Sequence, residues 1–159
     1  MRRSTFALLL MVVARPLGAQ GFAFVPRIQP EVRAEAALAR HASAMVMGGA
    51  NTPLGLYLRA GAAVGAGVAD SENGAVVATR ADLSLRFLLD PFAEHAWGPY
   101  AGGGLTVRRD GTTPARVGLL LILGVEGRRA RRWTSAVEAA LGEGIRFAVV
   151  LRKRRANGR

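Results

Sequence analysis

Cysteine is absent from the 159 residues of this chain, which excludes disulfide bonds, thiol catalysis and cysteine-based metal centres. Such a chain must be held together by packing and backbone hydrogen bonds, and the absence of cysteine is compatible with export. Histidine is nearly absent as well, since His41 and His95 are the only two. Two histidines without a carboxylate cluster do not match a typical zinc site, so we predict neither a metal nor another cofactor.

Lysine and aromatic residues are scarce, and the net charge of +11 therefore comes from arginine, with Lys153 as the only lysine. Arginine pairs well with phosphate and carboxylate groups. Binding of single-stranded nucleic acid also needs aromatic side chains for stacking, and none is interleaved with the arginines of 128–132 or of the C-terminus. We predict no nucleic-acid binding. These arginine clusters are expected to be solvated, with contact to anionic lipid headgroups as the alternative.

Long hydrophobic runs are missing after the N-terminus, although 50% of the residues are hydrophobic. No later stretch approaches the roughly 18 consecutive apolar residues that mark a transmembrane helix. The length fits one domain. The apolar side chains must therefore be accommodated by another kind of structure.

The first residues have the three-part pattern of a secretory signal peptide. Arg2 and Arg3 are followed by the apolar run 6–14, Pro16 lies after this run, and Ala19 offers a small residue for cleavage. We predict a cleaved signal peptide over 1–19, followed by an extended segment over 20–30. The alternative is a buried N-terminal helix of a cytosolic protein.

Strict alternation of apolar and other residues marks most of the mature chain. Every even position from Leu54 to Val68 is apolar, and in 77–89 the odd positions are apolar except for Thr79. The same period of two recurs in 117–125, 133–141 and 145–151, and more weakly in 32–39, 43–49 and 100–108. A period of two is typical of β-strands and not of helices.

These segments predict an all-β fold, a closed antiparallel up-and-down β-barrel of about eight strands over 31–154, with a basic tail over 155–159. Each strand is long enough to cross a bilayer when tilted. In hydrocarbon every backbone amide must be paired within the protein, so a spanning sheet has to close on itself. The predicted barrel is therefore of the transmembrane type, with both termini on the periplasmic side.

The charged faces of the strands would then point into the barrel. Eight strands enclose a space that side chains fill, which predicts a filled lumen without a large pore. The predicted lumen charge network consists of Arg33, Glu35, Arg59, Arg80, Asp82, Arg86, Arg116, Glu126, Glu138, Arg146 and Arg152.

The last alternating segment reads Gly144-Ile145-Arg146-Phe147-Ala148-Val149, with a glycine followed at a fixed spacing by an aromatic and an apolar residue. Together with the signal peptide and the alternation, it resembles the small bacterial outer-membrane β-barrel family. The resemblance implies a place in the outer membrane, with membrane lipid and the outer-membrane assembly machinery as partners. We expect a monomer.

Function is less well specified by the residues. No catalytic motif surrounds His41 or His95, and the spacing of Gly102-Gly103-Gly104 is not that of a phosphate-binding loop. We predict that the protein is not an enzyme, with a lipid-modifying barrel as the alternative, and that its role is structural or one of surface interaction. A soluble periplasmic or secreted barrel that encloses an apolar ligand would show the same alternation, with its apolar face inside.

Overall fold

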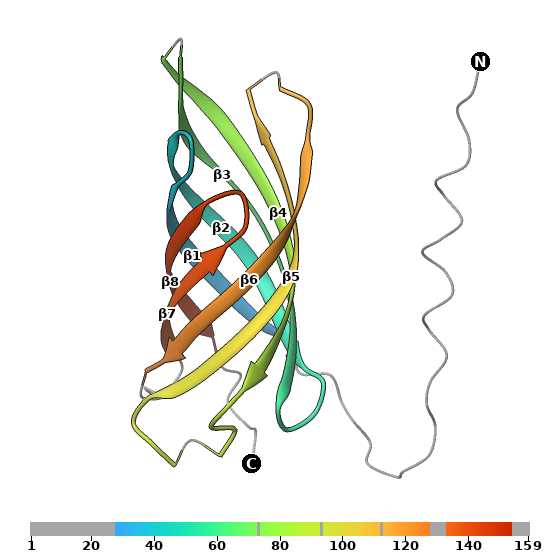
Figure 1. Cartoon of the computed structure of the whole chain (residues 1–159). Coiled ribbons are helices and arrows are strands. Elements are labelled where there is room, and N and C mark those ends of the chain that lie inside the picture. Colours follow the sequence, from blue (N-terminus) through green and yellow to red (C-terminus); the bar gives the residue numbers. More distant parts are fainter. Residues whose placement is uncertain (1–27, 73, 93, 112, 128–132, 154–159) are drawn as a thin grey trace, which may run out of the picture.

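The computed structural model describes residues 28–72, 74–92, 94–111, 113–127 and 133–153, and within these ranges the chain forms a closed eight-stranded barrel (Figure 1). The strands are β1 (Gln29–Leu38), β2 (Ala42–Pro53), β3 (Leu58–Ser71), β4 (Gly74–Leu88), β5 (Gly98–Asp110), β6 (Arg116–Glu126), β7 (Trp133–Leu141) and β8 (Ile145–Lys153). Within the described ranges, no helix is long and apolar enough to cross a membrane.

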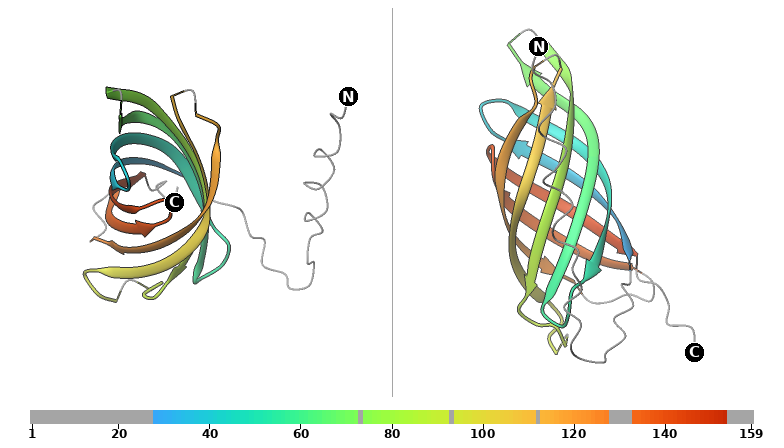
Figure 2. Two further views of the ribbon diagram at one scale, coloured as in Figure 1. Left: turned by 45° about the horizontal axis from the view of Figure 1, so that its top comes forward. Right: turned by 90° about the vertical axis from the view of Figure 1, so that its right-hand side faces the viewer.

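Each strand pairs antiparallel with the next strand in sequence, and β1 pairs with β8 to close the ring. At this seam Glu31 lies opposite Arg152 and Leu38 lies opposite Ile145. The two further views in Figure 2 show the tilted strands of this closed, up-and-down arrangement. The predicted fold class is thereby confirmed.

The start of β1 and the end of β8 lie at one end of the barrel, which we call the terminal end. The opposite end is the far mouth. The β1–β2, β3–β4, β5–β6 and β7–β8 connections are at the far mouth, with described residues 39–41, 72, 111, 113–115 and 142–144. Those at the terminal end are β2–β3, β4–β5 and β6–β7, with described residues 54–57, 89–92, 94–97 and 127. At the far mouth Ser71 pairs with Gly74 across the tightest of these turns. Gly74 has a φ of 109°, which favours glycine.

The two faces of every strand differ in the way the alternation predicts. In β8, Phe147 and Val149 are exposed on the outside, whereas Arg146 and Arg152 are buried inside. In β4, Leu83 and Leu85 lie outside and Arg80 and Asp82 inside, all with side-chain exposure matching the alternation. An outer surface of Leu, Val, Ile and Phe side chains therefore surrounds an interior that contains the buried charged side chains.

The strand boundaries near the terminal end differ from the sequence prediction. The predicted strand 54–68 begins only at Leu58 and runs on to Ser71, while β2 continues to Pro53. Leu54 and Leu56 lie in the connection, where Gly55 has a φ of 142°. The alternation continues through this connection without interruption, so the pattern alone could not locate the turn.

Glycines on the inner faces allow neighbouring strands to approach closely. A Cβ atom added to Gly104 would lie 1.9 Å from the carbonyl oxygen of Leu83, and one added to Gly67 would lie 2.0 Å from that of Ala44. Gly49, Gly65 and Gly102 show the same contact at 2.3 Å. In a barrel of eight strands the inner face is strongly concave, and glycine at these positions removes the side-chain atom that would prevent this curvature.

The predicted signal peptide of 1–19 lies outside the described residues. So do most of the segment 20–30 and the whole of the basic tail 155–159. The barrel itself begins two residues before the predicted position 31, at Gln29, and its last described strand ends at Lys153.

Candidate functional site

The interior holds a connected set of ion pairs, which we call the interior network. It comprises six arginines and five carboxylates, namely Arg33, Arg59, Arg80, Arg86, Arg146, Arg152, Glu31, Glu35, Asp82, Glu126 and Glu138. These residues come from β1, β3, β4, β6, β7 and β8. Buried charges are tolerated only when they are paired, and here the charges nearly balance.

Glu138 lies at the centre of the network. Its carboxylate oxygens lie 3.0 Å from Arg33 Nη2 and 3.3 Å from Arg86 Nε, and the hydroxyl of Tyr100 donates a hydrogen bond of 2.6 Å to it. The exposed fraction of Glu138 is 1%. One carboxylate of β7 thus connects side chains of β1, β4 and β5.

Glu31 joins the central part to the terminal end. It lies 3.4 Å from Arg33, 3.5 Å from Arg86 and 3.3 Å from Arg152, and the side-chain amide of Asn51 donates a hydrogen bond of 3.0 Å to it. Through Asn51, β2 also contributes to the polar interior.

At the terminal end, Glu126 forms ion pairs with Arg59 and with Arg152. Arg59 comes from β3, Arg152 from β8 and Glu126 from β6. The three side chains are about nine-tenths buried. This triad is the last layer of the interior network before the terminal end.

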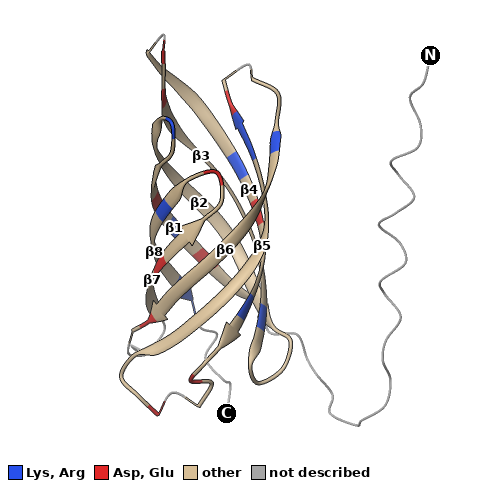
Figure 3. Cartoon of the chain, viewed as in Figure 1, with Lys and Arg blue, Asp and Glu red and all other residues tan. Residues whose placement is uncertain are grey.

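Toward the far mouth, Glu35 pairs with Arg80 and lies 3.7 Å from Arg146. Arg146 in turn lies 3.4 Å from Asp82, which accepts a hydrogen bond of 2.6 Å from the Thr106 hydroxyl. Figure 3 shows how acidic and basic residues recur on strands all around the barrel.

Ten of the eleven residues predicted for the lumen belong to the interior network. Arg116 does not, because β6 begins there and its side chain is exposed at the far mouth. Glu31 was missed by the sequence prediction. Glu31 lies on the same face of the strand as Arg33 and Glu35. It precedes the predicted strand 32–39, however, where the alternation gives little signal.

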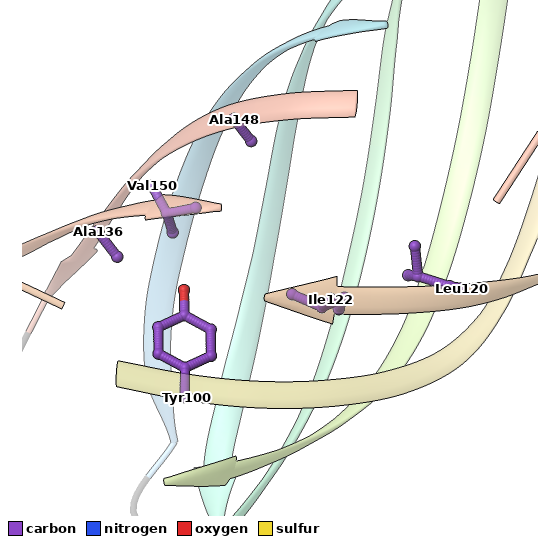
Figure 4. Packing of buried hydrophobic residues seen from close by; sticks show 6 residues of the cluster. All are labelled: Tyr100, Leu120, Ile122, Ala136, Ala148 and Val150. Carbon is purple, nitrogen blue, oxygen red and sulfur yellow. The ribbon is translucent and has the colours of Figure 1, made fainter. Parts of the chain in front are cut away.

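An apolar cluster also lies in the interior, on β5 to β8. Its members are Tyr100, Leu120, Ile122, Ala136, Ala148 and Val150 (Figure 4). Leu120 and Ile122 interrupt the alternation of 117–125 in the sequence, and the structure shows that both side chains point inward. The ring of Tyr100 covers Gly124, where an added Cβ atom would lie 2.3 Å from the Tyr100 Cζ.

The far mouth contains a cleft of about 420 Å³. Its charged lining residues are Arg40, His41, Asp70, Arg108, Asp110, Arg116 and Glu143. Arg108 is paired within its own strand, because its Nε donates to both carboxylate oxygens of Asp110 at 2.8 and 3.0 Å. The chain thus places three of its four far-mouth connections, together with the ends of β3, β5 and β6, around one polar cleft.

The two histidines lie at opposite ends of the barrel. His41 lines the far-mouth cleft, and His95 Nδ1 lies 3.4 Å from Asp90 in the exposed connection 89–97. The backbone N–H groups of His95 and Glu94 donate to the Asp90 carboxylate, and these hydrogen bonds lower the pKa of Asp90. Among the described residues no three His, Asp or Glu side chains are grouped as metal ligands would be.

No protein-family model matches this sequence, and no curated protein matches it either. Two solved structures share its fold. Neisserial surface protein A (NspA) has 12% identical residues and a TM-score of 0.62, with 80% of this chain and 96% of that one covered. The N-terminal β-barrel domain of Pseudomonas aeruginosa OprF has 10% identity and a TM-score of 0.57, with 80% and 98% covered. This chain has the fold of a small outer-membrane β-barrel.

The likeness confirms the resemblance predicted from the alternation and the final strand. The alternative prediction, a soluble barrel with its apolar face inside, is wrong for this structure. Large apolar side chains such as Leu119 and Val117 are exposed on the outside, and the charged side chains are buried inside.

Proposed function

We propose that this protein is an integral outer-membrane barrel with a structural or surface-interaction role, a filled lumen and no enzymatic activity. The observation that carries the proposal is an arrangement opposite to that of a water-soluble protein, which has apolar side chains inside and charged ones outside. The outer face of the strands is apolar, while six arginines and five carboxylates are paired inside. Water does not favour such an outer face, whereas the hydrocarbon of a bilayer does.

Aromatic side chains at the terminal end support this placement. Phe87, Trp97 and Trp133 are exposed there, and the ring of Tyr57 stacks on Phe87 with a centroid distance of 5.7 Å. Aromatic residues concentrate at the two interfaces between membrane and water. The terminal end would then face the periplasm and the far mouth the cell exterior.

The size of the interior side chains supports the proposed filled lumen. Arg86, Tyr100, Met47 and Glu138 are each at most 2% exposed, and they come from four different strands. The partners that we propose are membrane lipid around the outer face and the assembly machinery that recognises the final strand, with the barrel acting as a monomer.

Membrane fractionation tests the location. The protein expressed in a Gram-negative host should be recovered with the outer membrane and resist extraction by urea. The purified, detergent-folded protein should migrate differently on a gel before and after heating, because closed barrels resist the detergent until they are heated. Recovery in the soluble periplasm, or identical migration of both samples, would contradict the proposal.

A further inference from the structure

A row of three arginines ends at the far-mouth cleft. Arg80 of β4 lies opposite Arg108 of β5, and Arg108 lies opposite Arg116 of β6. Like charges directly opposite one another on neighbouring strands are unfavourable unless anions compensate them. Arg80 is compensated by Glu35 and Arg108 by Asp110, but the ion pairs of the described residues do not include Arg116.

Among the three arginines of the row, Arg116 is therefore the one whose positive charge can pair with a bound anion. It shares the cleft with Arg40 and His41 of the connection 39–41. Guanidinium groups bind phosphate and carboxylate groups through paired N–H donors. The far-mouth cleft thus offers a place for one anionic group.

The same cleft also contains acceptors. The carboxylates of Asp70 and Glu143 and the hydroxyl of Thr113 lie along it, and Asp70 and Glu143 are absent from the ion pairs of the described residues. Carboxylates accept hydrogen bonds from hydroxyl groups but repel anions. A ligand that fits both the basic and the hydrogen-bond-accepting side chains of the cleft must therefore carry an anionic group together with several hydroxyl groups. A cavity of about 420 Å³ is within the range of small-molecule sites.

We propose that the far-mouth cleft binds an acidic sugar. Arg116 and Arg40 hold its phosphate or carboxylate group, and Asp70 and Glu143 accept hydrogen bonds from its hydroxyl groups. The proposal deepens the surface-interaction role given above and rests on it for the exposure of this mouth at the cell surface.

Calorimetric titration of the folded full-length protein in a neutral detergent tests the site. The probes are glucose 6-phosphate and glucuronate, with glucose and inorganic phosphate as controls. One or both acidic sugars should bind, and each control should bind at least about ten-fold more weakly than the better sugar. Absence of binding by both acidic sugars would overturn the proposal. So would inorganic phosphate that binds as tightly as glucose 6-phosphate, since the hydroxyl contacts would then contribute nothing.

Arg116→Gln should weaken binding of the acidic sugar by about ten-fold or more, because a charge-assisted hydrogen bond is lost. Arg109→Gln is the matched control. Arg109 is adjacent to Arg108 and exposed, but it lies on the other face of β5 and does not line the cleft. An equal loss in both variants would show that binding depends only on general positive charge, and would overturn the proposal.

Glu143→Ala gives an independent check of the hydroxyl contacts, because it removes the acceptor oxygens, and should weaken binding of the sugar relative to that of inorganic phosphate. Unchanged sugar binding in this variant would count against Glu143 as an acceptor. Heat-dependent gel migration of each variant shows that the barrel has folded. If the protein folds into a membrane barrel but does not bind acidic sugars, only the proposed site is refuted. If it does not form a barrel, the proposed function is refuted.

Discussion

At the scale of single residues, the interior is tightly packed around Tyr100. The ring lies against Gly124, and a Cβ atom added there would come within 2.6 Å of three atoms of Tyr100. We predict that Gly124→Ala destabilises the folded barrel by about 1–3 kcal/mol, because the ring must leave its present position. Urea-dependent unfolding in lipid vesicles measures this difference.

Gly48→Ala is the control for that substitution. Gly48 lies on the outer face of β2, and an added Cβ atom would meet nothing within 4 Å. Tyr100→Leu should reduce the cost of Gly124→Ala when the two are combined, because the colliding ring atoms are gone. If the destabilisations caused by Gly124→Ala and Tyr100→Leu are additive in the double variant, the contact between Gly124 and the Tyr100 ring does not explain the effect of Gly124→Ala.

Glu138 is a buried member of the interior network whose loss should destabilise the barrel. Glu138→Gln removes the negative charge next to Arg33 and Arg86, both of which are buried. Because Glu31 still lies near both arginines, we expect a loss of up to about 3–5 kcal/mol, the range for removing one partner of a buried ion pair. The same unfolding measurement applies, with Glu72→Gln as the control, because Glu72 is exposed next to the end of β3. A similar small effect in both variants would mean that water replaces the missing carboxylate.

Inward-pointing residues could be predicted from sequence where a strand is long and odd and even positions clearly belong to different faces. Arg80, Asp82 and Arg86 are examples, because each stands in the middle of an uninterrupted alternation. Leu120 and Ile122 could not be placed in the same way, since apolar residues occupy both faces of β6. The pairing of particular arginines with particular carboxylates depends on the strand register, which alternation does not contain.

At the scale of elements, the outer faces of the strands should be sensitive to charge according to depth. Leu83 lies near the middle of β4 on the outer face, and Val77 lies on the same face near the far mouth. Leu83→Arg should destabilise the barrel by about 2–4 kcal/mol and Val77→Arg by about 0–1 kcal/mol. Unfolding in vesicles of a single lipid provides the comparison. Equal costs at the two positions would show that the outer face does not cross a bilayer.

The connection 89–97 should respond to acid. Because two backbone N–H groups donate to the Asp90 carboxylate, its pKa is lowered on folding. A lowered pKa means that the carboxylate stabilises the folded connection at neutral pH, and that this contribution is lost as the pH falls through the lowered value. Hydrogen exchange of the Glu94 and His95 amides should accelerate at acidic pH, after correction for intrinsic rates. Asp90→Asn should remove most of this pH dependence.

The elements themselves were largely predictable, and the exceptions have a common cause. A strand and the connection that follows it can share one alternating pattern, as the residues from Leu54 to Leu58 do. Only the backbone at Gly55 marks the turn. The hairpin around Gly74 was easier, because Asn73-Gly74 is a strong turn signal in the sequence.

At the scale of the whole molecule, the proposed filled lumen would prevent ions from passing through the barrel. Side chains of Met47, Arg86, Tyr100 and Glu138 occupy the interior from different sides. We predict no stable ion conductance when the purified barrel is inserted into planar bilayers. Long-lived open channels of uniform size would show that the interior network opens or that more strands assemble. The control is the heated, unfolded protein, which should also give none.

The seam between β1 and β8 has a consequence for the order of the chain. Its antiparallel pairing is of the same kind as that of the other neighbouring strands, so the ring has no structurally distinct first strand. If residues 28 and 153 were joined by a short linker and the chain were opened at 72–73, the circular permutant would have the same neighbours around the ring. The cyclic order of the strands, and not the strand that comes first, defines this barrel.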